Sequence, residues 1–170
     1  MNYIIVLFSI IIFYGFVFSQ NHSIASVSIS AKLIYGIQIE KIQNDLNFGE
    51  IILPVTNQNI EINPSNGIRF KIKSNPNKFV FINYYDIILN KESPQSLSTN
   101  DQILFVPLVI STGAFENYIN PIQVISGNAY EAENVNGLGL LNIWLGGKLN
   151  LTSQNSAGNF SGTFVLNISY

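Results

Sequence analysis

Apolar and polar residues alternate most regularly in the last part of the chain, over residues 143–170. A repeat of two residues is typical of a strand that buries one face. This part of the chain therefore predicts two strands joined by a polar turn over residues 153–158. The expected inward positions are Ile143, Leu145, Leu149 and Leu151 on the first strand, and Phe160, Phe164, Leu166, Ile168 and Tyr170 on the second. We expect Phe164, Leu166 and Ile168 to lie in the core.

A longer alternating series lies near the start of the chain, where every odd position over residues 25–39 is apolar. This series is far longer than the usual strand of about 5–6 residues. We therefore expect the segment to bend or change sheet near Gly36, or its first half to lie outside its own domain.

Between these two series, short alternating segments are separated by turn residues, as in an all-β sandwich. The expected strands are residues 50–53, 59–63, 68–73, 78–89 and 103–110, with a short one at 122–125. Residues 78–89 are apolar at both parities, so both faces of that strand should be covered. Pro107 should mark an edge or a bulge. Residues 111–136 are otherwise the least regular part, and no long window has the spacing of a capped helix.

Residues 3–18 form an almost unbroken apolar run, which the polar Gln20 follows closely. The run is slightly short for a membrane span, which needs about 20 residues, and Val17 and Ser19 suit the positions that a signal peptidase reads. We predict that residues 1–19 are a signal peptide and that residues 20–170 are a single exported domain, with no membrane span after cleavage. Because no Lys or Arg precedes the run, the alternative is an uncleaved N-terminal anchor.

The chain carries few charged residues and no cysteine. Charged residues make up 11% of the sequence and the formal net charge is −2, which gives no electrostatic basis for binding nucleic acid. The absence of cysteine excludes disulfides, thiolate catalysis and zinc sites with sulfur ligands. So little charge gives weak protection against self-association, which is a liability in a monomer and useful in a subunit that assembles.

Four motifs resemble a family of exported bacterial proteins, domain of unknown function 4402 (DUF4402). They are residues 45–51 (DLNFGEI), 70–76 (FKIKSNP), 145–151 (LGGKLNL) and 157–164 (AGNFSGTF). The resemblance covers most of the predicted mature chain. It implies an immunoglobulin-like antiparallel β-sandwich without catalytic residues. The alternating end of the chain, with Gly158 upstream and Tyr170 at the end, is also similar to fimbrial subunits and spore-coat-U-type proteins, which often carry a disulfide that this chain lacks.

Side chains suited to catalysis are scarce. The only histidine, His22, lies beside the predicted cleavage site, where a catalytic arrangement would lack rigid support. Glu131 and Glu133 are the nearest pair of carboxylates, and they could act in glycoside hydrolysis or hold calcium with Asn128 or Asn134. The simpler interpretation is that both are solvated on a loop. We expect no enzymatic activity, no metal and no cofactor.

Trp144 is the residue whose environment the pattern leaves open. By alternation it lies on the polar face of its strand, where an exposed Trp could stack on a sugar or anchor an interface. A bulge at Gly146 and Gly147 would instead shift the register and return Trp144 to the core. Tyr118 and Tyr130 are further candidates for contact with a ligand or a partner.

These features favour a non-catalytic, exported structural or surface protein that associates through strand edges, in the manner of a fimbrial subunit. The alternative is a monomeric extracellular β-sandwich module that binds a glycan or another ligand. For association, the small apolar residues near the start could insert beside the last strand of a second copy, because main-chain hydrogen bonds supply affinity at an open edge. These residues are Ala25, Val27, Ile29 and Ala31. The ordinary alternative is that they form the first strand of their own sandwich.

Overall fold

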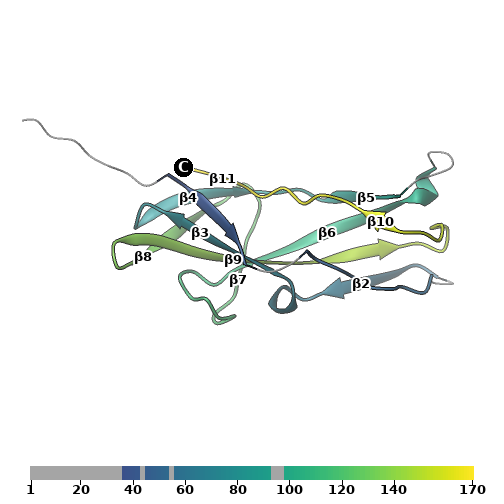
Figure 1. Cartoon of the computed structure of the whole chain (residues 1–170), viewed down its shortest axis with the longest axis horizontal. Helices are drawn as coiled ribbons and strands as arrows, with labels where there is room; N and C mark the ends of the chain where they lie inside the picture. The colour runs from purple at the N-terminus through teal and green to yellow at the C-terminus, as the bar shows by residue number, and fades with distance from the viewer. Residues whose placement is uncertain (1–35, 43–44, 54–55, 93–97) are drawn as a thin grey trace, which may run out of the picture. The chain divides into compact units, whose positions relative to one another are not determined.

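Antiparallel β-strands make up nearly all of the regular structure (Figure 1). The computed structural model describes residues 36–42, 45–53, 56–92 and 98–170. The strands in this part of the chain are β1 (Gln38–Lys41), β2 (Gln58–Ile62), β3 (Ile68–Ser74), β4 (Lys78–Asn83), β5 (Ile87–Lys91), β6 (Gln102–Ser111), β7 (Ile122–Gln123), β8 (Ala129–Val135), β9 (Leu138–Leu151), β10 (Phe160–Ser161) and β11 (Asn167–Ser169). Two short 3-10 turns accompany them, η1 (Pro64–Asn66) and η2 (Thr99–Asp101).

The long strand β9 is the centre of the larger sheet, because strands pair with it along both edges. Its predicted inward residues are all buried, and its pairing register runs without a bulge through residues 143–151, so the first half of the strongest sequence pattern is confirmed. On one edge, β3 pairs with residues 139–145 and β2 pairs with residues 147–151. The chain passes from β2 to β3 through η1, over Gly146.

The other edge of β9 pairs with β6 and, nearer its start, with β8. Beyond β6 come β5 and then β10 at one end, and the short β7 at the other. The two-residue turn between β8 and β9 consists of Asn136 and Gly137, both at positive φ. This is the geometry of the tight hairpin turn that Asn-Gly favours.

A smaller sheet consists of β8, β4 and β11, so β8 belongs to both sheets. Its inward residues Val80 and Ile82 meet Ile72, Leu141 and Ile143 of the larger sheet in the main core. Two antiparallel sheets packed face to face form a sandwich. The predicted all-β antiparallel sandwich is therefore confirmed.

A second core lies toward the other end of the larger sheet. Its buried members are Ile103, Phe105, Leu149 and Leu151. The smaller sheet contributes no residue to it. Residues 45–53 cover it instead, with Leu46, Phe48 and Ile51 packed against it. These residues form no strand, so the strand predicted at 50–53 is wrong: the segment crosses the sheet and pairs with nothing in the described part of the chain.

Three other predictions about strands need correction. Residues 78–89 divide into β4 and β5 because the chain leaves one sheet for the other at residues 84–86. Only one face of this segment is covered, contrary to the prediction, since Phe79 and Phe81 are 59% and 44% exposed on the outer face of the smaller sheet. The region 111–136 contains β8 as well as the predicted short strand, and residues 160–170 form two short strands and not one.

The predicted signal peptide, residues 1–19, and the candidate assembly residues Ala25, Val27, Ile29 and Ala31 lie outside the described residues. The described residues all fall within one compact unit, residues 34–170. No helix in these ranges has the length and hydrophobicity needed to cross a membrane.

Candidate functional site

Residues 160–170, which we call the C-terminal edge segment, lie at the margin of both sheets. β10 ends the strand order of the larger sheet beside β5, and β11 ends that of the smaller sheet beside β4. In Figure 1 the segment runs in yellow along these two strands. Within the described ranges, no strand lies beyond β10 or β11. In the part that the structure describes, the segment is therefore an open edge shared by both sheets, besides the unpaired outer edges of β1, β2 and β7.

Alternate side chains fix this segment to the sandwich. The half-buried ones are Phe160, Phe164, Leu166 and Ile168, which are four of the five positions predicted to face inward. The three predicted to lie in the core, Phe164, Leu166 and Ile168, pack against it without full burial. The fifth inward position, Tyr170, is 50% exposed, so that prediction is wrong. The ring of Phe164 lies 6.2 Å from that of Tyr84. The hydroxyl of Tyr170 accepts hydrogen bonds from the backbone nitrogen of Asn75 at 3.2 Å and from its Nδ2 at 2.8 Å. These contacts hold the segment at both ends.

The backbone of β11 presents hydrogen-bonding groups to the open side. Ile82 of β4 is opposite Ile168, and its own backbone N–H and C=O are bonded to Asn128 and Gly127 on the β8 side. In an antiparallel pair, two opposite residues either bond to each other or both direct their N–H and C=O away from each other. The N–H and C=O of Ile168 must therefore point away from β4, toward the open edge.

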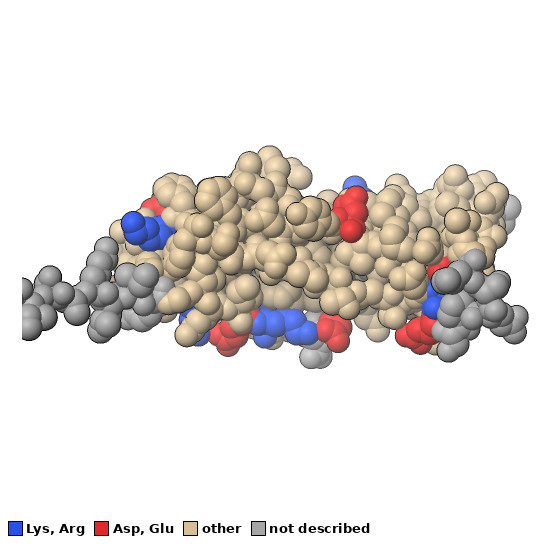
Figure 2. Space-filling model, turned by 90° about the horizontal axis from the view of Figure 1, so that it is seen from above, with Lys and Arg blue, Asp and Glu red and all other residues tan. Residues whose placement is uncertain are grey.

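The outward side chains of the segment are small, polar or apolar, and none is charged. Thr163, Val165, Asn167 and Ser169 are exposed, and residues 160–170 contain no Asp, Glu, Lys or Arg. Natural edge strands usually carry Lys, Pro or other charged residues that block pairing with another chain. Figure 2 looks down on this side of Figure 1, and charged side chains are sparse there. The edge therefore lacks protection by charged side chains, and its paired strands are short, at 2 and 3 residues.

Trp144 lies on the outer face of the larger sheet and is nevertheless only 7% exposed. Its Nε1 donates a hydrogen bond to Thr112 Oγ1 at 3.0 Å. The ring of Tyr118 meets it edge-on, with centroids 5.4 Å apart, and the guanidinium carbon of Arg69 lies 5.6 Å from its centroid. The proposed bulge at Gly146 and Gly147 is not the cause of this burial, because β6 pairs with β9 residue for residue over positions 143–150.

The burial of Trp144 comes from residues 112–118, which we call the cover loop. Hydrogen bonds join its backbone to Asn142 of β9, in both directions, at Thr112 and Gly113. Glu116 accepts hydrogen bonds from Arg69 and from Lys71 of β3. The hydrogen bond from Lys71, its positive charge and that of Arg69 lower the pKa of the Glu116 carboxyl. An ion pair thus fastens the loop over the Trp.

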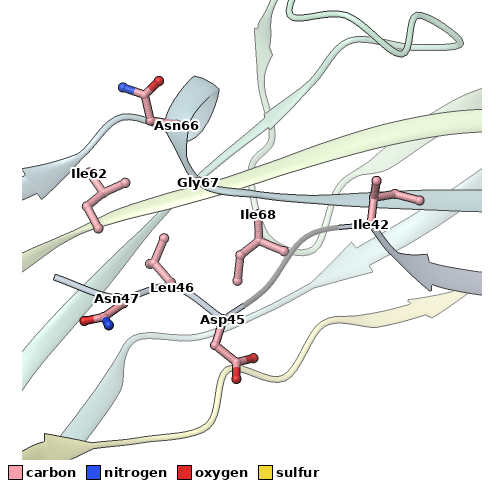
Figure 3. A pocket seen from close by; sticks show the side chains of 8 residues that line it. All are labelled: Ile42, Asp45, Leu46, Asn47, Ile62, Asn66, Gly67 and Ile68. Carbon is pink, nitrogen blue, oxygen red and sulfur yellow. The ribbon is translucent and has the colours of Figure 1, made fainter. Parts of the chain in front are cut away.

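A hollow of about 540 Å³ lies where residues 45–47 pass the start of β3 (Figure 3). Figure 3 shows Leu46, Ile62 and Ile68 among its lining residues. Its polar side chains already serve the local structure: Asp45 accepts a hydrogen bond from Lys41 at 2.7 Å, and Asn47 Oδ1 accepts one from the N–H of Gly49. This hollow offers no set of groups that could perform a reaction.

A second hollow, of about 330 Å³, lies beside Tyr118 on the outer face of the larger sheet. We call it the Tyr118 hollow. Its lining residues come from β2, η1, β6, β7, β9 and the cover loop, and they are Glu61, Asn63, Pro64, Leu108, Val109, Ile110, Tyr118, Gln123 and Lys148. Burial raises the pKa of the Tyr118 hydroxyl, so the phenol keeps its proton at neutral pH.

The other candidate residues lie apart from both hollows. Tyr130 points into the sandwich, opposite Val80, and its hydroxyl accepts a hydrogen bond from the N–H of Ile125 at 2.6 Å. Glu131 and Glu133 are exposed on β8, a strand and not the loop that the sequence suggests. In the described ranges, no three His, Cys, Asp or Glu side chains gather as metal ligands would.

Sequence reasoning missed the cover loop and the residues that fasten it. Residues 112–118 show no alternation and no helical spacing, so nothing in their pattern indicates that they lie on Trp144. The one available signal was charge: Glu116 is the single acidic residue between Asp101 and Glu131, and Arg69 and Lys71 alternate on a predicted strand face.

Comparison of the chain with known proteins finds no related protein. No protein-family model, no curated protein and no solved structure matches the chain. The resemblance to the DUF4402 family and to fimbrial subunits therefore stays a prediction from the sequence.

Proposed function

We propose that this protein is a non-catalytic, exported structural or surface subunit that associates through its open β-strand edge. The observation that carries the proposal is the C-terminal edge segment: it ends the strand order of both sheets, presents backbone hydrogen-bonding groups outward and carries no charge. An edge of this kind recruits a further strand because main-chain hydrogen bonds give affinity and alternate side chains give register.

The apolar surface beside the edge supports association. Phe79 and Phe81 are exposed on β4, and Ser169 of β11 is opposite Phe81. Val165, between the two short strands, is 55% exposed. Burying such side chains would add about 25 cal/mol for each Å² of apolar surface removed from water. An added strand would thus gain both hydrogen bonds and apolar contact.

The proposed occupant is a strand of a second copy, drawn from the alternating residues Ala25, Val27, Ile29 and Ala31. Their spacing of two would place all four side chains on one face of an added strand. Export rests on the predicted signal peptide at residues 1–19, and the absence of cysteine means that neither folding nor assembly depends on disulfides.

The test is the size of the exported chain in solution, measured by sedimentation over a range of concentrations. We expect oligomers that dissociate on dilution. Ser169→Lys places a charge on the open edge next to the outward groups of Ile168 and should shift the chain toward monomer. Asn128→Lys adds the same charge on the β8 side of the smaller sheet, away from the open edge, and should leave the oligomers unchanged.

Two outcomes would contradict the proposal. The wild-type chain could remain strictly monomeric at high concentration, or Ser169→Lys could oligomerise as well as the wild type. Deleting residues 20–30 then identifies the occupant. Loss of oligomers with the fold intact supports insertion of that segment, whereas loss of the fold in a monomeric protein means that the segment is the first strand of its own sandwich.

A further inference from the structure

The Tyr118 hollow combines a rigid aromatic wall with an apolar floor. Tyr118 is held edge-on against Trp144, whose own position is fixed by the hydrogen bond to Thr112. Leu108 and Ile110 of β6 supply the floor, because they lie on the outer face of the sheet while their neighbours Pro107 and Val109 face inward. A wall that does not need to move on binding loses little conformational entropy.

Polar groups of both kinds surround this apolar wall and floor. Glu61 and Lys148 face each other across β2 and β9, with Oε2 and Nζ 3.3 Å apart, so their charges cancel. The Oδ1 of Asn63 accepts hydrogen bonds from the N–H and hydroxyl of Ser65, so the Nδ2 of Asn63 is the group left to donate to a ligand. Gln123 is exposed at the rim, and its amide has no hydrogen-bond partner among the described residues.

We propose that the Tyr118 hollow binds the ring of a neutral sugar. A sugar ring has an apolar C–H face that packs on an aromatic side chain, and hydroxyls that both donate and accept hydrogen bonds. The rim offers donors (Lys148, Asn63), an acceptor (Glu61) and a group that is both (Gln123). A charged ligand would gain no net electrostatic attraction from this pair, because the charges of Glu61 and Lys148 neutralise each other.

The size of the hollow agrees with a small ligand. Its volume of about 330 Å³ lies at the lower end of the range of ligand pockets, about 300–1,000 Å³. This site is on the outer face of the larger sheet and does not involve the C-terminal edge segment, so the proposal is independent of assembly through that edge.

The test uses the only tryptophan of the chain as a reporter, since Trp144 is in ring contact with Tyr118. The full exported chain is titrated with free glucose, galactose, mannose and N-acetylglucosamine, and both Trp fluorescence and saturation-transfer NMR signals of the sugar are recorded. We expect saturable binding of at least one sugar with a Kd on the order of 1 mM, as suits one small ring in an open site.

Variants separate this site from other surfaces. Tyr118→Ala should weaken binding at least about tenfold and Gln123→Ala several-fold, because each removes a wall or a rim contact. Tyr85→Ala removes a tyrosine that is 74% exposed outside the hollow and should bind as the wild type does. Ser169→Lys should also leave sugar binding unchanged. Circular dichroism melts confirm that each variant is folded.

The proposal is overturned if none of the four sugars gives a saturable NMR signal with the wild type. It is equally overturned if folded Tyr118→Ala binds as tightly as the wild type, or if a neutral peptide or inorganic phosphate saturates the Trp signal and the sugars do not.

Discussion

At the scale of single residues, Gly146 shows how one missing side chain allows a backbone crossing. β2 and β3 pair with the same edge of β9, and the chain between them passes over Gly146. A Cβ there would lie 2.2 Å from the carbonyl oxygen of Ile62 and 2.6 Å from the nitrogen of Pro64. Both are backbone atoms, so neither can turn aside as a side chain can.

We therefore expect Gly146→Ala to destabilise the fold by on the order of 3 kcal/mol, the upper end of the usual cost of overpacking. Urea unfolding followed by circular dichroism measures the free energy of unfolding. Gly36→Ala is the matched control, because a Cβ at Gly36 has no heavy atom within 4 Å. An unfolding free energy equal to that of the wild type in Gly146→Ala would show that the crossing is looser than described.

Neighbouring residues of the C-terminal edge segment offer a second comparison. Leu166 is half-buried against the main core, whereas Val165 is 55% exposed on the opposite face. Leu166→Ala should cost about 2 kcal/mol, the lower end for buried Leu, because part of the side chain is already in water. Val165→Ala should change stability by less than about 0.5 kcal/mol. Equal effects of the two substitutions would mean that the segment does not keep its inward and outward faces in solution.

At the scale of elements, the cover loop is an irregular segment held over a strand by a carboxylate. The pKa of Glu116 is lowered in the folded protein, so the ionised form stabilises the fold. This contribution is complete above the ordinary Glu value of 4.5 and is lost as the pH falls through the lower folded value. Below that range the carboxyl of Glu116 loses its charge attraction for Lys71 and Arg69, while its backbone carbonyl still accepts the hydrogen bond from Arg69.

Acid should therefore loosen the cover loop and expose Trp144. We expect the Trp emission to shift to longer wavelength as the pH falls below 4.5, in a transition that Glu116→Gln removes or weakens. Asp45→Asn is the control, because the pKa of Asp45 is also lowered, by the hydrogen bond and charge of Lys41, but not by any residue at the Trp. A transition of the same size in Glu116→Gln would assign it to another group.

Elements were predictable where a local pattern decides them. The inward residues of β9 follow from alternation alone, and so do those of the C-terminal edge segment except Tyr170, which is exposed. The Asn136–Gly137 turn was also visible in the sequence as an Asn-Gly pair, and it could have revealed the hairpin of β8 and β9. The break at residues 84–86 could not be predicted from the sequence, because it depends on which strands pair with each half of the segment. β4 pairs with β8 and β11, whereas β5 pairs with β6 and β10.

At the scale of the whole molecule, long-range contacts limited what could be predicted of the candidate sites. The sequence left the environment of Trp144 open: simple alternation agrees with the face on which it lies, but its burial depends on Thr112, which is 32 positions away in the sequence. Glu116 is 45 positions from Lys71, and the Tyr118 hollow collects residues from five strands or turns and a loop. Hydrophobic periodicity describes one strand at a time, so it carries no information on contacts between residues that are distant in the sequence.

The central place of β9 also has a consequence for how the chain folds. β2 pairs Gln58 with Leu151, and β3 pairs Ile68 with Leu145, so both strands need a partner that is synthesised much later. Pairings of such high sequence separation fold slowly, because loop closure is unfavourable until the distant contacts form. Until residues 138–151 follow, β2 therefore has no partner and β3 has only β1, so both expose an edge that is prone to aggregation. The larger sheet can thus assemble only late, after the one strand that β2, β3 and β6 share as a partner has been synthesised.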